Sequence, residues 1–271
     1  MNRGLQAMIN SHLLASGLAV LLLAQFGCSS ITMPDRPAPY RNSTTSHVDG
    51  MDFMPRLWKD TKAVYGSPEN LFYLTGGYGL GIVLDHYGLE DDLADRFDKH
   101  NYLNDKVGTG LDHLGSGVVL LGGAAAWYGY STLVDDREAM AHSQTLASAL
   151  ILTGVSTLGL KAIFRDERPN GVPEGYPSGH SAMSMAAATT LGELYGWKIG
   201  VPAVLVSGMV AFQRLDSREH DLDDIVGGFT LGWVVASAVA GRHKVEVLGA
   251  EMVPIIDPIQ NGVGIGLQWR F

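Results

Sequence analysis

Long apolar runs separated by short polar breaks dominate the chain between Leu71 and Gly241. The runs are rich in Ala, Leu, Met and Gly and are long for β-strands, so we expect them to form helices. Six runs are found, at residues 71–84, 114–134, 139–160, 181–192, 199–213 and 225–241. This pattern predicts an all-α fold with a six-helix bundle as its core.

The segments on either side of these runs differ in composition. Residues 29–69 are rich in Pro, Ser, Thr, Asn and charge, which favours a linker or an N-terminal arm. Near the other end, residues 262–271 alternate apolar side chains with Gly, Gln or Arg, which is the period-two pattern of a strand. We therefore expect a helical domain over residues 70–243 and a short C-terminal β-hairpin over residues 244–271. The acidic segment 89–100 predicts a surface helix.

The first 28 residues have the layout of an export signal. Arg3 precedes an uncharged, mostly apolar stretch, and Gly27 and Cys28 follow that stretch directly. Cys28 is the single cysteine of the chain, and its position is typical of the lipid-modified cysteine of a bacterial lipoprotein. A retained membrane helix is the alternative, but the apolar stretch is short for a bilayer. We expect residues 1–28 to direct the chain to the cell envelope.

Charge narrows the possible partners. The formal net charge is −9, and phosphate backbones select basic surfaces, so we expect no nucleic-acid partner. Charged residues are only 17% of the chain and glycines number 34, which is compatible with helices packed in a membrane. Only the second and third runs reach the roughly 20 residues that span a bilayer. A membrane-associated bundle is favoured, and a soluble bundle stays open.

Three polar blocks at the ends of the apolar runs carry the candidate chemistry. The first follows the third run and contains Lys161 and Arg168, about two helical turns apart. Because Pro169 disfavours helix at the preceding residue, we expect Arg168 to lie just past the helix end. The second block begins the fourth run, where Ser178 is a natural N-cap and Gly179 allows close approach of the backbone. Free N–H groups at such a helix start bind anions.

The third block contains Arg214 and the pair formed by His220 and Asp224, at i and i+4 on one helical face. A carboxylate there can accept a hydrogen bond from one imidazole nitrogen and leave the other nitrogen free to attack. Asp223 is a less favoured partner, and His180 has no acid one turn further along the chain. Because successive helices alternate in direction, all three blocks are predicted to meet at one end of the bundle.

The order Lys-x6-Arg-Pro, Pro-Ser-Gly-His and Arg-x5-His-x3-Asp resembles the signature of the type 2 phosphatidic acid phosphatases. Vanadium haloperoxidases and bacterial class A acid phosphatases share that signature. The family usually has Ser before the last arginine, whereas this chain has Gln213, which weakens the case for one accessory phosphate contact. The resemblance implies a bundle of the acid phosphatase/haloperoxidase type.

The resemblance also implies roles for individual residues. The phosphate oxygens would be held by Lys161, Arg168, Ser178, Gly179 and Arg214. No metal is implied, and no cofactor is expected unless the chain is a haloperoxidase, which would bind vanadate.

Three further residues would carry out the reaction. His220 would attack phosphorus and form a phosphohistidine, and Asp224 would orient His220. His180 would protonate the leaving alcohol and then activate water. The remaining histidines that lie among the helices have no ligand spacing, and the adjacent pairs Asp85–His86 and Asp112–His113 are expected to be structural or exposed.

The leading hypothesis is a metal-independent phosphatase that acts on a phosphate monoester or diphosphate, on a lipid, with its site facing the periplasm or the outside. A soluble exported acid phosphatase acting on small esters is the main alternative. A vanadate-dependent haloperoxidase and a catalytically silent lipid-binding scaffold are further alternatives, and the intact His180, His220 and Asp224 argue against the scaffold.

Overall fold

The computed structural model describes residues 53–87, 89–240, 245–247, 250–257 and 262–269. Two compact units divide the chain. One unit spans residues 36–243 and contains every described helix, and the strands within residues 244–271 belong to the other unit.

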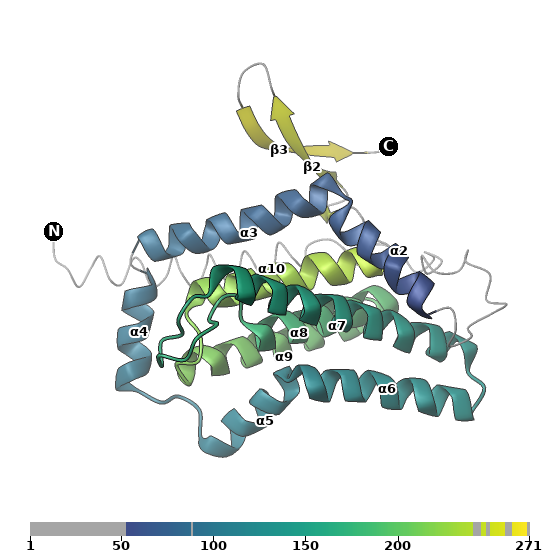
Figure 1. Cartoon of the computed structure of the whole chain (residues 1–271), viewed down its shortest axis with the longest axis horizontal. Coiled ribbons are helices and arrows are strands. Elements are labelled where there is room, and N and C mark those ends of the chain that lie inside the picture. Colours follow the sequence, from purple (N-terminus) through teal and green to yellow (C-terminus); the bar gives the residue numbers. More distant parts are fainter. Residues whose placement is uncertain (1–52, 88, 241–244, 248–249, 258–261, 270–271) are drawn as a thin grey trace. The chain divides into compact units, whose positions relative to one another are not determined.

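Nine helices lie in the described part of the larger unit (Figure 1). They are α2 (Phe53–Tyr65), α3 (Pro68–His86), α4 (Leu89–Lys99), α5 (Asp105–Gly115), α6 (Gly117–Leu133), α7 (Arg137–Phe164), α8 (Gly179–Tyr195), α9 (Trp197–Asp216) and α10 (Leu222–Val239). Each of the six apolar runs forms most of one helix, in the order α3, α6, α7, α8, α9 and α10. The acidic segment expected to be a surface helix is α4.

Helix α2 lies inside the segment that the sequence assigned to a linker or arm. Val64 of this helix is fully buried in the apolar cluster formed by side chains of α6, α7, α8 and α10. Arg56 also donates a 2.8 Å hydrogen bond to Gln144 of α7. The sequence did not predict this helix, because it buries only a narrow stripe within an otherwise polar segment. Since Val64 belongs to the core, the core of the described helices extends beyond the six apolar runs.

The second apolar run also divides differently from the prediction. Ser116 has an extended backbone, with φ −64° and ψ 124°, and separates α5 from α6. Asn104 caps the start of α5 by accepting a 3.0 Å hydrogen bond from the N–H of Val107. Helix α5 is therefore a separate short element, and it ends where the long apolar helix begins.

Two glycines bring α10 and α8 into direct backbone contact. A Cβ atom added at Gly228 would lie 2.5 Å from the carbonyl oxygen of Ser178, and one added at Gly232 would lie 2.2 Å from that of Ala182. No side chain fits at such distances. Because both contacts advance in the same direction along the two helices, α8 and α10 run parallel, and their starts lie at the same end of the bundle.

Strands β1 (Val245–Val247), β2 (Ala250–Asp257) and β3 (Gly262–Trp269) form an antiparallel sheet in the order β1-β2-β3. Ala250 pairs with Trp269, and Val245 pairs with Met252. The segment expected to form a two-stranded hairpin therefore contains a third, shorter strand.

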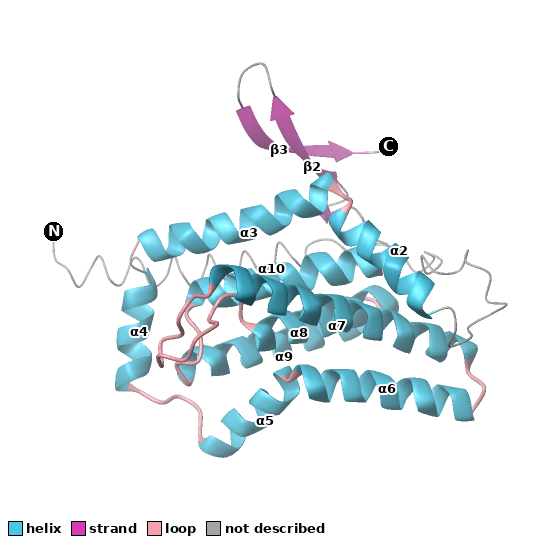
Figure 2. Ribbon diagram, in the orientation of Figure 1, coloured by secondary structure: helices cyan, strands magenta, loops and turns pink. Residues whose placement is uncertain are grey.

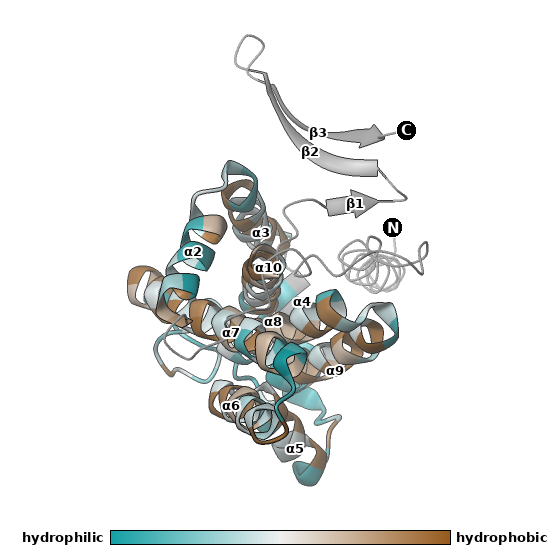
Figure 3. Ribbon diagram, turned by 90° about the vertical axis from the view of Figure 1, so that its right-hand side faces the viewer, coloured by the Kyte–Doolittle hydropathy of each residue, from teal (hydrophilic) through white to brown (hydrophobic). Residues whose placement is uncertain are grey.

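Among the described helices, three are long and apolar enough to cross a membrane, namely α7, α9 and α10. In Figure 3 hydrophobic colour follows α3, α9 and α10, whereas α2 carries hydrophilic colour. Large apolar side chains are exposed on α7 and α9, including Leu158 at 66% and Leu205 at 64%. The sequence had favoured the second and third runs by length. The second run forms α6, which has 17 residues because the break at Ser116 shortens it.

Candidate active site

The site is built at one end of the bundle, where α7 and α9 end and α8 and α10 begin. Figure 2 shows the loop between α7 and α8 at this end of the helices. Helix α7 stops at Phe164, and Arg165 adopts a left-handed backbone with φ 52°, so the chain turns away from the helix before Arg168. Arg168 thus lies past the helix end, as Pro169 predicted. The two-turn spacing with Lys161 is not a helical one.

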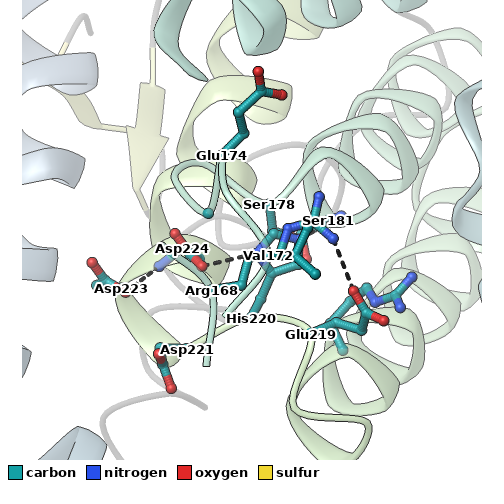
Figure 4. A network of polar contacts seen from close by, with 12 residues as sticks. Arg168, Val172, Glu174, Ser178, Ser181, Glu219, His220, Asp221, Asp223 and Asp224 are labelled. Atoms are coloured by element: carbon teal, nitrogen blue, oxygen red, sulfur yellow. Dashed lines mark hydrogen bonds and ion pairs between the residues drawn. The ribbon is translucent and has the colours of Figure 1, made fainter. Parts of the chain in front are cut away.

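His220 and Asp224 form the buried centre of the site. His220 Nδ1 lies 2.8 Å from Asp224 Oδ2, and the two side chains are 3% and 2% exposed (Figure 4). Asp223, the alternative partner, instead accepts a 2.6 Å hydrogen bond from the N–H of Asp224. This arrangement fixes the imidazole through Nδ1, and no described residue hydrogen-bonds to its Nε2.

Arg168 lies beside this pair and is oriented by a carboxylate. Its Nη1 donates a 2.9 Å hydrogen bond to Oε2 of Glu219, the residue before His220 (Figure 4). Arg168 Nε is buried and has no hydrogen-bond partner among the described residues. The guanidinium group is therefore held through Nη1, and its Nε–H can donate a hydrogen bond to a ligand.

Arg214, at the end of α9, repeats this pattern. Its Nη1 donates to Asp112 Oδ1 of α5, and its Nε is buried without a partner in the described part of the chain. The same Asp112 oxygen lies 3.4 Å from His180 Nε2. Arg214 is thereby joined to His180 through a residue that belongs to none of the three sequence blocks.

Lys161 is buried at the last turn of α7. Its ammonium group donates to the backbone carbonyls of Glu174 and Gly175, the latter at 2.8 Å. These carbonyls belong to the loop that leads to α8. The lysine therefore ties this loop to the helix and keeps a positive charge next to the His220–Asp224 pair.

The start of α8 completes the site. Ser178 is fully buried, and its hydroxyl accepts a 3.4 Å hydrogen bond from the N–H of Ser181. The N–H of Ser178 donates a 3.0 Å hydrogen bond to the carbonyl of Asp224, which joins the second block to the third. Gly179 is the first residue of the helix, where free N–H groups and the helix dipole favour an anion.

Both histidines are held in the neutral form. Burial, followed by the charges of Lys161, Arg168 and Arg214, lowers the pKa of His220 to about 3. Burial and Arg214 lower the pKa of His180 to about 4. A neutral His220 with its proton on Nδ1 presents a lone pair at Nε2, which is the state required of a nucleophile.

All eight residues that the sequence selected for catalysis and phosphate binding lie at this end of the bundle. Sequence reasoning missed Asp112 and Glu219, the two carboxylates that orient the arginines. Asp112 had been expected to be structural or exposed. Gln213 is buried, and its Oε1 has no partner among the described residues. Cys28, the expected lipidation site, lies outside the described residues.

Three cations, two of them with unused buried donors, surround a buried histidine that a carboxylate orients. Such an arrangement is suited to an oxyanion that carries several negative charges, and above all to a phosphoryl group, whose transfer requires positioning and neutralisation of its oxygens. The fold and the site together define a helical domain with a buried histidine set among three cations.

Comparison with known proteins agrees with this class. Residues 143–245 match the family model of the PAP2 superfamily. The matched residues contain all three blocks of the site.

Individual relatives are distant. The lipid A 4'-phosphatase of Helicobacter pylori is 24% identical over 139 residues, which cover 46% of this chain and 70% of that protein. The transmembrane PAP2-type phosphatidylglycerolphosphate phosphatase of Bacillus subtilis superposes with a TM-score of 0.50 at 19% identity, covering 64% of this chain and 92% of that one. LpxE of Aquifex aeolicus gives a TM-score of 0.47 at 21% identity, over 56% of this chain and 94% of that one.

Proposed function

We propose that this protein is a membrane phosphatase that hydrolyses a phosphate monoester or diphosphate on a lipid through a phosphohistidine intermediate. One observation carries the proposal. The buried Nε atoms of Arg168 and Arg214 have no protein partner among the described residues, and they lie beside a buried histidine whose Nδ1 is fixed by Asp224. Unpaired buried donors are costly, so their presence at one site indicates a ligand that accepts from both arginines.

In the first step Nε2 of His220 attacks phosphorus, and the bond from phosphorus to the leaving oxygen breaks. Asp224 stabilises the positive charge that develops on the imidazole. Lys161, Arg168 and Arg214 neutralise the phosphoryl oxygens, together with the donors at the start of α8. The product is a phosphohistidine and a leaving alkoxide, and the alkoxide requires a proton.

His180 supplies that proton and recovers it in the second step. Arg214 and burial disfavour the imidazolium form in the empty site, but a bound phosphate brings negative charge that offsets the arginine and raises the pKa of His180. After the alcohol leaves, neutral His180 takes a proton from water as the water attacks phosphorus. The P–N bond then breaks, which restores His220 and releases phosphate.

The lipid part of the proposal rests on the surface of the bundle. Helices α7 and α9 are long enough to span a bilayer, and large apolar side chains are exposed along α9 and over the C-terminal part of α7. Exposed apolar surface of this kind is unfavourable in water and favourable in lipid. The relatives from Helicobacter pylori and Bacillus subtilis are named for phosphates carried on lipids, which supports the same substrate class here.

Export is proposed from the sequence of residues 1–28, with the site facing the periplasm or the outside. Every site residue lies at one end of the bundle, so the site faces a single side of any membrane that the helices cross. Mass spectrometry of the mature protein is expected to find a start at or near Cys28, with a lipid mass if that cysteine is acylated. An intact Met1 together with a site accessible only from the cytoplasm would overturn the export proposal.

The test of the function is a phosphate-release screen with the full-length protein in detergent. Lipid phosphates, isoprenoid diphosphates and soluble esters are compared, each in excess EDTA, with His220→Ala as the inactive control. We expect release from at least one lipid substrate and no loss on chelation, because three side-chain cations supply the neutralisation. Release only from soluble esters would contradict the lipid assignment, and activity restored by a divalent ion would contradict metal independence.

A further inference from the structure

Helix α5 brings a carboxylate into the site from outside the three sequence blocks. Asp112 Oδ1 accepts a hydrogen bond from Arg214 Nη1, and the same oxygen lies 3.4 Å from His180 Nε2. The Asp112 side chain is 40% exposed, whereas that of Arg214 is 7% exposed. One carboxylate oxygen therefore lies between a cation of the phosphoryl pocket and the histidine on the leaving-group side.

The backbone around Asp112 is fixed at both ends of α5. Before the helix, Asp216 at the end of α9 accepts hydrogen bonds from the backbone N–H groups of residues 102–103, at 2.8 and 3.0 Å. At the end of the helix, Gly115 packs so closely that an added Cβ would lie 3.1 Å from His180 Cβ. Because α5 is held against both α8 and α9, the position of Asp112 relative to the site is set by rigid elements.

The charges that face His180 give this carboxylate a chemical consequence. They are Arg214 of α9, Asp112 of α5, and Glu219 and His220 of the loop before α10. Burial, Arg214 and His220 disfavour the imidazolium form of His180, whereas the two carboxylates favour it. Of these carboxylates, Asp112 is the one that lies beside the imidazole ring.

We propose that Asp112 is a positioning residue that holds His180 ready to deliver a proton to the leaving oxygen and holds Arg214 by one edge. This inference rests on the proposed phosphatase function. In the step concerned, the bond from phosphorus to the leaving oxygen breaks and the His180 imidazolium proton passes to that oxygen. Asp112 remains a carboxylate throughout, and Arg214 keeps its Nε free for the phosphate.

The test compares Asp112→Asn with Asp105→Asn, which makes the same charge change at an exposed position of the same helix. The full-length protein is assayed with a nitrophenyl phosphate, whose leaving group needs little protonation, and with an alkyl phosphate, whose leaving group needs a proton. We expect kcat/KM of Asp112→Asn to fall by about 10-fold to 100-fold on the alkyl ester. On the aryl ester the fall is expected to be about one tenth as large. Asp105→Asn is expected to match the wild type on both.

The pH profile supplies a second readout that a purely structural role would not move. Turnover of the alkyl ester falls as pH rises through the pKa of His180 in the substrate complex. Loss of the neighbouring carboxylate lowers that pKa, so the fall moves to lower pH in Asp112→Asn. Asp112→Glu keeps the carboxylate and is expected to recover part of the rate and of the profile, and it carries the test if Asp112→Asn unfolds.

Two results would overturn the role of Asp112. One is an equal loss of kcat/KM on both esters, with no shift in the pH at which turnover of the alkyl ester falls. The other is an Asp112→Asn variant whose kcat/KM matches that of Asp105→Asn on both esters. Failure of the wild type to release phosphate from any ester would instead overturn the proposed function, so the two failures are distinguishable.

Discussion

Two buried histidines at opposite ends of the bundle differ in the groups that surround them. His142, near the start of α7, lies 3.1 Å from the Tyr195 hydroxyl through Nδ1, and its Nε2 lies 4.0 Å from Glu138. Among the described residues, His220 is paired only through Nδ1, and its neighbours include arginine donors for which this part of the chain supplies no partner. Both are buried and both have a polar partner. The difference lies in the charges around them, because the carboxylates of Glu138 and Asp136 face His142, whereas three cations face His220.

The largest expected effect comes from exchanging these two histidines for alanine. His220→Ala is expected to lose at least about 10³-fold in kcat and to form no phosphoenzyme, because the nucleophile is gone. His142→Ala is expected to keep activity within about threefold and to lose about 1 kcal/mol of stability with its hydrogen bond. Phosphate release and thermal unfolding are measured on both variants. A large loss of kcat in His142→Ala would show that the two ends are not independent.

His180→Ala tests the second histidine of the site. The substitution is expected to lower kcat by about 10²-fold to 10⁴-fold. With a nitrophenyl ester, phosphohistidine should still form and then persist, because water activation is lost. With an alkyl ester its formation should be slow. Rapid quench with labelled substrate, followed by counting of acid-labile phosphate, measures both. If His220→Ala retains label and His180→Ala never does, the two roles are reversed.

Vanadate tests whether the pocket is arranged around five-coordinate phosphorus. Transition-state analogues bind at least about 100-fold more tightly than ground-state ligands, so orthovanadate is expected to inhibit well below the concentration at which phosphate does. His220→Ala should bind the two anions almost equally, as measured by calorimetry. Equal inhibition of the wild type by both anions would argue against the proposed pocket.

The sequence predicted the long helices well because apolar runs are their direct signature. It missed α2 because this helix buries a single narrow stripe, as Val64 illustrates, and propensity and composition both favoured a linker. The candidate site could be predicted because its residues lie in three short blocks with fixed spacing. His220 and Asp224 were expected on one helical face, but α10 begins at Leu222, so His220 lies in the loop before the helix. The contact nevertheless forms across the four-residue spacing.

Asp112 was missed because its contact with Arg214 spans 102 positions and has no local spacing. A usable signal was nonetheless present. Asp112 lies just before the second apolar run, and alternation of helix direction places the start of that run at the same end as the end of the third. The same reasoning that joined the three blocks would have brought α5 to the site. Glu219 has no comparable signal, since an acid beside His220 points to the site only once the loop conformation is known.

The smallest expected effect concerns the acid limb of the pH profile. His220 must be neutral to attack, and its pKa of about 3 leaves it neutral through most of the acid range. Arg168 contributes to that lowering, so Arg168→Leu removes a positive charge and raises the pKa of His220 toward its ordinary value. As pH falls, the variant should therefore lose kcat/KM at higher pH than the wild type, by up to about one or two pH units.

Arg168→Lys is the matched control, because it keeps the charge while losing the bidentate geometry, and it should weaken phosphate binding without moving the acid limb of the profile. A nitrophenyl ester is used for all three proteins, so that ionisation of the substrate is common to them and protonation by His180 is not limiting. An acid limb that stays in place in Arg168→Leu would mean that the charge of Arg168 does not contribute to the lowered pKa of His220.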